Sequence, residues 1–193
     1  MTKNRQNLNR FVAAWFLNLF MFMPSANAAE KISLEYGIFN RTLSIDLLEH
    51  LAKTGEAKKP LKNIMRFGNQ SPTTLSKLLK EEHDLPLITT SKLMYSSIGE
   101  VIIIRVAKII HPMKIKDNSV SIPAIRSGVI NGIVQGNGKL SLIQFLKSYP
   151  NKTIAINIPA LSKVLNKVET MNELIKFFAD SPITGIKKGK ASD

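Results

Sequence analysis

Three residues within one helical turn carry side chains of the kinds that bind metals. Asp46, Glu49 and His50 stand at positions i, i+3 and i+4, which places them on one helix face. One histidine with two carboxylates is a sparse zinc set, and the spacing is not that of the H-E-x-x-H motif. The pattern therefore favours a solvated helix face. His83 and His111 each follow a predicted helix, which favours histidines at helix ends over metal ligands.

Two other catalytic signatures are incomplete. The segment Gly136-Asn137-Gly138-Lys139 resembles a phosphate-binding loop, but that motif requires glycine in place of Ile133 and serine or threonine in place of Leu140. The sequence contains no G-x-S-x-G nucleophile elbow. It also has no cysteine for thiol catalysis or thiolate–metal binding. We therefore predict no catalytic residues, no cofactor and no metal site.

Positive charge is the most unusual property of the sequence. Between Val101 and Val168 there are ten cations and one acid, Asp117. Such an excess creates positive potential on the surface of the fold. Five of these cations are candidates for an anion-binding patch: Arg105, Lys108, Arg126, Lys163 and Lys167.

This charge has two interpretations that the sequence leaves open. It either keeps a lysine-rich surface solvated, or it binds an anionic partner such as a membrane surface or an envelope polymer. Nucleic acid is disfavoured as a partner because lysine far outnumbers arginine, the side chain that makes bidentate phosphate and base contacts.

The first 28 residues have the pattern of a cleavable signal peptide. Three cations and no acid precede an apolar run over residues 11–23, and Ala26-Asn27-Ala28 supplies small residues for a signal peptidase. An uncleaved anchor is the alternative, but this run is shorter than the ~20 residues that span a bilayer. We expect export to the periplasm, the thylakoid lumen or the extracellular space, with Ala29 as the first residue of a mature chain of net charge +10.

Residues 29–182 are predicted to form one domain, followed by a disordered basic tail over residues 183–193. Alternating apolar residues on both sides of Gly37 predict a hairpin or a bent edge strand, and Ser44 is a suitable cap for a helix over residues 45–54. Further helices are predicted over residues 60–67, from Pro72, over residues 89–95, 97–110, 123–136 and 142–149, and from Pro159 to Phe178.

The middle of the chain contains an ambiguous segment, a polar loop and a helix with regularly spaced small residues. Residues 101–110 are rich in β-branched side chains, but the capping-box spacing of Ser97 and Glu100 favours a buried helix. Residues 111–120 are predicted to be a polar loop, with Pro123 opening the next helix. That helix carries Ala124, Gly128, Gly132 and Gly136 at every fourth position, which predicts close packing against a neighbouring helix.

The pattern as a whole predicts an α+β fold that is mainly α. Residues 153–158 alternate as a strand and are expected to join the N-terminal hairpin in a small sheet. The rest is expected to be a bundle of about seven or eight short helices.

Several short segments resemble a known family. They are EKISLEYG at residues 30–37, SIDLLE at 44–49, LMYSSIGE at 93–100, AIR at 124–126, and LIQFLKSYP at 142–150 before IAINI at 154–158. Over residues 29–168 the chain resembles the exported N-terminal domain of unknown function found in cyanobacterial alpha/beta hydrolases. In such proteins the catalytic machinery lies in a downstream hydrolase domain. The resemblance therefore implies an accessory domain that here stands alone.

We expect an exported, non-catalytic interaction domain that binds or modulates an envelope partner, such as a separately encoded alpha/beta hydrolase. One alternative is that the chain forms part of an esterase- or lipase-type hydrolase system. The other is a basic module that binds an anionic membrane surface or envelope polymer.

Overall fold

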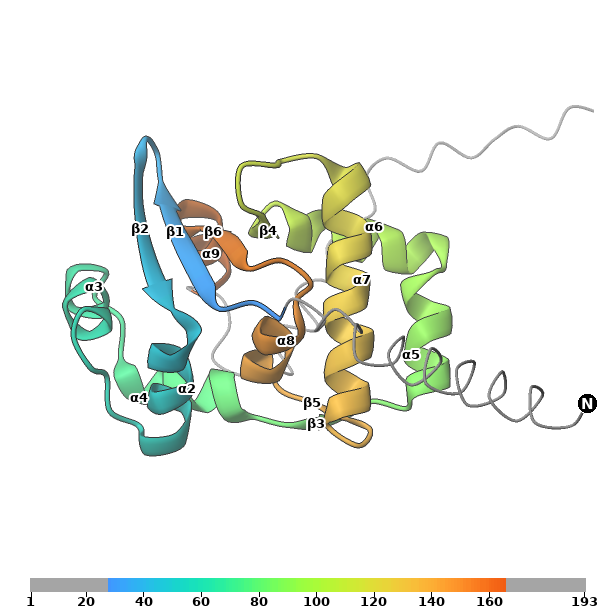
Figure 1. Ribbon diagram of the computed structural model, residues 1–193, viewed down its shortest axis with the longest axis horizontal. Helices are drawn as coiled ribbons and strands as arrows, with labels where there is room; N and C mark the ends of the chain where they lie inside the picture. The colour runs from blue at the N-terminus through green and yellow to red at the C-terminus, as the bar shows by residue number, and fades with distance from the viewer. Residues whose placement is uncertain (1–27, 166–193) are drawn as a thin grey trace, which may run out of the picture.

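The structure is a computed structural model, and it describes residues 28–165 (Figure 1). The predicted signal peptide lies outside the described residues, except for its last position, Ala28. So do the second half of the last predicted helix and the predicted basic tail. The domain boundaries at 29 and 182 accordingly stay predictions.

The described chain begins with the expected hairpin. Strand β1 (Lys31–Tyr36) and strand β2 (Phe39–Ser44) are antiparallel, with Lys31 opposite Ser44 and Tyr36 opposite Phe39. Gly37 adopts φ 61° in the connecting turn, a left-handed conformation that glycine enters without a steric penalty. The prediction of a hairpin with its turn at Gly37 is confirmed.

This hairpin is half of a four-stranded sheet with the order β2-β1-β6-β4. Strand β6 (Thr153–Asn157) joins the hairpin, as predicted for the late strand. It runs parallel to β1, and β4 (Ile110–Pro112) pairs antiparallel with β6. The predicted loop over residues 111–120 was therefore wrong at its start. A three-residue edge strand that ends in proline carries too little alternation to be recognised locally.

Helices make up most of the rest. Within residues 28–165 there are eight: α2 (Ile45–Thr54), α3 (Leu61–Phe67), α4 (Pro72–Lys80), α5 (Leu87–Met94), α6 (Ser97–Ala107), α7 (Asn118–Gln135), α8 (Leu142–Ser148) and α9 (Ile158–Leu165). A two-stranded sheet pairs β3 (His83–Asp84) with β5 (Lys139–Leu140). The expectation of a mainly helical α+β fold is confirmed.

The ambiguous segment after residue 97 is helical to Ala107, as predicted, but its cap is one residue earlier. The predicted end at residue 110 was wrong, because Ile110 begins strand β4. Ser96 Oγ accepts a hydrogen bond from the Gly99 amide, whereas Ser97 is already inside α6. The chain turns sharply at this corner between α5 and α6. A Cβ on Gly99 would overlap the carbonyl of Leu93, so the corner requires glycine.

Helix α7 starts at Asn118, five residues before the predicted start. Asp117 is its cap, with Oδ1 accepting from the Ser119 amide at 2.9 Å. Pro123 lies inside the helix with its ring exposed. The prediction that Pro123 opens the helix was wrong, because an aspartate cap six residues upstream extends the helix through a proline that still lies near its N-terminus.

The small-residue face of α7 packs against α8, as predicted. A Cβ on Gly128 would lie 2.9 Å from Phe145 Cε2 and 3.3 Å from Tyr149 Cδ2. The two rings meet edge to face at 5.8 Å, and Tyr149 is completely buried. Its hydroxyl makes no hydrogen bond within the described residues, and burial raises the pKa of Tyr149.

The sheet is buried on both of its faces. Ile32 and Ile154 are buried on one face, and their neighbours Ser33 and Ala155 are buried on the other. Helix α9 packs against β1 and β6, while α7, α8 and the α5–α6 pair form the other side of the domain (Figure 1). The sheet is therefore a central layer between helices.

Candidate functional site

The second buried face of the sheet brings a serine, a histidine and a carboxylate together. Ser33 of β1, Ala155 of β6 and His111 of β4 stand opposite one another across three strands. Because Ala155 carries only a methyl group, the His111 ring extends over β6 toward β1. Its Nε2 lies 3.6 Å from Glu35 Oε2, and its Nδ1 lies 3.0 Å from the Pro112 carbonyl oxygen.

These are the residue types of a Ser-His-acid triad, but their geometry is not that of one. A nucleophilic serine requires a hydrogen bond to its base. Ser33 Oγ makes no hydrogen bond within residues 28–165, and both ring nitrogens of His111 face other oxygens. The side chains of Ser33 and His111 are 1% and 3% exposed, which closes them to substrate. His111 thus lies in a strand rather than at a helix end.

The four described cations of the proposed anion-binding patch come from three helices. Arg105 and Lys108 lie at the end of α6, Arg126 lies in α7, and Lys163 lies in α9. Lys108 and Lys163 are exposed. Lys167 lies outside the described residues. Anion binding by these residues stays a prediction.

Arg126 has a structural role that the charge pattern did not indicate. Its Nε donates to the Met94 carbonyl at 2.8 Å, and its Nη2 donates to Glu100 Oε2 at 2.9 Å. Its guanidinium also stacks over the Tyr95 ring, 4.7 Å from the ring centre. With only 15% of its side chain exposed, Arg126 fastens α7 to the corner between α5 and α6.

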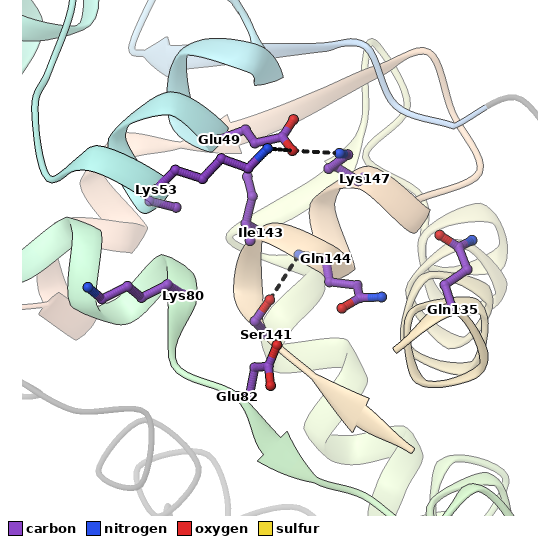
Figure 2. Close-up of a pocket in the computed structure, with 10 residues that line it drawn as sticks. Glu49, Lys53, Lys80, Glu82, Gln135, Ser141, Ile143, Gln144 and Lys147 are labelled. Atoms are coloured by element: carbon purple, nitrogen blue, oxygen red, sulfur yellow. Dashed lines mark hydrogen bonds and ion pairs between the residues drawn. The ribbon is translucent and has the colours of Figure 1, made fainter. Parts of the chain in front are cut away.

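Asp46, Glu49 and His50 share one face of α2, and of these three residues Glu49 lines a pocket. Figure 2 shows a pocket of about 530 Å³ in which the Glu49 carboxylate lies between two lysines. Glu49 Oε1 is 2.8 Å from Lys53 Nζ and 2.9 Å from Lys147 Nζ. Within residues 28–165 no three histidine or acidic side chains are grouped to hold a metal ion. Glu49 therefore serves as an ionic link between α2 and α8.

We expect this link to make stability depend on acid pH. Hydrogen bonds from Lys53 and Lys147 lower the pKa of Glu49 from its ordinary value of 4.5. The stabilisation is complete above that value and is lost as the pH falls through the lower pKa of the folded state. Glu49→Gln should therefore reduce the loss of stability in acid, as measured by urea unfolding from neutral pH to below 4.5. Lys147→Gln should give an intermediate profile, and identical profiles for all three proteins would contradict this.

The glycine-rich segment after α7 is a connecting turn. The amides of Gly136, Asn137 and Gly138 donate to carbonyls in the last turn of α7, and the Gly138 carbonyl accepts from Leu85. Lys139 Nζ lies 3.8 Å from Glu82. The amides that would hold a phosphate are thus used within the turn between α7 and β5.

The largest set of exposed apolar side chains lies on the two helices beside α7. Helix α5 has no buried residue. Five large apolar residues of this corner are exposed: Leu87, Ile88, Leu93, Tyr95 and Ile98. We call these five residues the α5–α6 face. Within residues 28–165 no single helix meets the length and apolarity of a membrane span, although α5 and α6 do so together across a 79° bend.

Together, the described residues form a mainly helical α+β domain that has an exposed apolar corner and an unassembled Ser-His-Glu group whose serine and histidine are buried. The chain also matches a known family. The family is described as an alpha/beta hydrolase of unknown function (DUF1400), and its model matches residues 28–157. The chain belongs to this family. Comparisons with curated proteins and with solved structures found no match.

Proposed function

We propose that this chain is an exported, non-catalytic accessory domain, and that its α5–α6 face docks the catalytic domain of an alpha/beta hydrolase in the cell envelope. The observation that carries the proposal is the exposure of this face. Ile88 is 72% exposed and Ile98 58%, although both belong to helices of an ordered domain. Several exposed large apolar side chains on neighbouring elements are typical of protein interaction sites.

The arrangement around the face supports docking of another folded domain. Arg126 holds the corner by a hydrogen bond and an ion pair, so the face is presented on a fixed support. Tyr95 offers a ring backed by that guanidinium, and tyrosine and arginine are enriched in residues that dominate binding energy. Exposed apolar side chains on two neighbouring helices suit a partner with a complementary apolar surface.

The Ser-His-Glu group supports a role without catalysis. Ser33 lacks a hydrogen-bonded base, and both Ser33 and His111 are buried. The family description associates such domains with alpha/beta hydrolases. These two observations together favour a partner that supplies the chemistry.

Export is compatible with the packing at the start of the domain. Ala29 is buried, and the amides of Glu30 and Lys31 donate to the Lys152 carbonyl. Cleavage after Ala28 would therefore leave these contacts intact. N-terminal sequencing of the exported chain should find Ala29 first, and a chain that retains Met1 would contradict export by cleavage.

The docking proposal predicts which surface controls affinity. Ile88→Ser combined with Leu93→Ser should weaken binding to the catalytic domain of an alpha/beta hydrolase encoded beside this chain by about tenfold or more, because two apolar anchors are lost. Calorimetric titration measures the change. The matched control is Val134→Ser on α7, which is 56% exposed but outside the face, and its affinity should be unchanged. Equal affinities for all three proteins would contradict docking through this face.

A second experiment tests the absence of catalysis. A serine-reactive fluorophosphonate should leave the purified domain unlabelled, and the domain should not hydrolyse acyl esters. Labelling of Ser33 with turnover, abolished by Ser33→Ala and by His111→Ala, would overturn the non-catalytic part of the proposal and leave the docking face untouched.

A further inference from the structure

The tip of the β1–β2 hairpin is a second exposed apolar surface, separate from the α5–α6 face. Tyr36 is 63% exposed, Ile38 92% and Phe39 72%. In Figure 1 the hairpin extends beyond the helices, and its tip stands clear of them. We call Tyr36, Ile38 and Phe39 the hairpin tip. The fold of the described residues thus leaves three large apolar side chains around one turn mostly exposed to solvent.

Charge around the hairpin tip is positive. Between Tyr36 and Ser44 there is one cation, Arg41, and no acid. Arg41 is exposed and stands two residues from Phe39, on the same side of β2. The nearest acid of β1, Glu35, is paired with Lys116 at 3.3 Å. An anionic surface that approaches the tip therefore meets Arg41 and the exposed Lys116. The Glu35 carboxylate is neutralised by its pairing with Lys116.

We propose that the hairpin tip inserts into the interface of an anionic lipid bilayer. Aromatic side chains such as Tyr36 and Phe39 are favoured at the headgroup level of membranes. Insertion stays shallow because the backbone of the turn needs water or headgroups as hydrogen-bond partners. Arg41 and Lys116, behind the tip, are placed to contact anionic headgroups.

Shape favours a bilayer over a protein as the occupant. A stable protein interface needs about 800 Å² from each partner, and three side chains at a convex tip offer only about half of that. A bilayer interface instead accepts a narrow protrusion, and each buried apolar side chain contributes independently. This inference goes beyond the docking proposal and uses different residues, so either can fail alone.

The experiment uses tryptophan as a local probe. The chain has one tryptophan, Trp15, so Trp15→Phe with Phe39→Trp gives a full-length chain with a single reporter at the tip. Vesicles of phosphatidylcholine with phosphatidylglycerol should shift its emission to the blue, and brominated lipid should quench it. Vesicles of phosphatidylcholine alone should have little effect. The reporter reads the tip itself, whatever residues 1–28 contribute to vesicle binding.

Two variants test the two parts of the surface. In the reporter chain, Ile38→Ser should raise the lipid concentration for half-maximal shift about tenfold, because an inserted side chain is lost. Arg41→Gln should raise it about fivefold on anionic vesicles, and added salt should diminish that difference.

The matched control carries its tryptophan on the α5–α6 face, as Trp15→Phe with Ile88→Trp, and should not respond to vesicles. No response at position 39, or an equal response at position 88, would overturn the proposal. A blue shift without lipid would also overturn it. Dependence of that shift on protein concentration would show that a second copy covers the tip, and independence would show that the chain itself does.

Discussion

Gly99→Ala is expected to lower the melting temperature of the domain by about 2–12 °C. The added Cβ would occupy the position of the Leu93 carbonyl, which is backbone and cannot rotate away. The corner between α5 and α6 would have to open, and overpacking of this kind costs about 1–3 kcal/mol. Thermal unfolding followed by circular dichroism measures the shift.

Two controls separate this overlap from the general effect of alanine. Gly68→Ala is the matched substitution, because its nearest neighbour would lie 3.5 Å away in ordinary contact. It should change stability little. Ser96→Ala removes the cap of α6 and should cost about 1 kcal/mol. A Gly99→Ala protein as stable as Gly68→Ala would show that the corner is not fixed by backbone contact.

The same corner shows what the sequence could predict. The helix predicted over residues 97–110 is favoured over a strand because Ser97 and Glu100 have capping-box spacing, although the residues that follow are β-branched. That choice was right because capping is local, and its signal lies within four residues. The error of one residue at the cap arose because Ser96 and Ser97 are equally good caps in isolation.

Elements that depend on distant partners were harder to predict. Strand β4 exists because Ile110 and Pro112 pair with a strand more than forty residues later, and nothing within three residues signals that pairing. The grouping of His111 with Glu35 depends on that pairing. The position of His111 relative to Ser33 could therefore not be predicted from the sequence.

The charged and apolar surfaces also depend on contacts between residues that are distant in the sequence. The number of cations predicted a basic segment that includes Arg126. In the fold, however, the Arg126 guanidinium is held by Met94 and Glu100, which lie 32 and 26 residues away in the sequence. Ile38 and Ile98 are exposed, and their sequence positions do not signal this, because an apolar pattern does not show which residues the fold covers. The two exposed apolar surfaces therefore emerged only from the assembled fold.

Gly128→Leu is the other substitution for which we expect a large effect. The leucine would push against the Phe145 and Tyr149 rings, which are packed edge to face and buried, so neither can swing aside. We expect a loss of about 2–3 kcal/mol in the free energy of unfolding, after the roughly 1 kcal/mol that replacing a helical glycine returns.

Two leucines elsewhere on α7 test whether these rings are the reason for that loss. Gly132→Leu should be milder, because its new Cβ would meet the flexible end of Leu140 rather than a ring. Asn131→Leu lies on the exposed side of the same helix and should be neutral within about 0.5 kcal/mol. Urea unfolding at neutral pH ranks the three proteins. Equal losses at positions 128 and 131 would mean that leucine perturbs α7 itself, whereas the order 128, 132, 131 requires the close approach of α7 to α8.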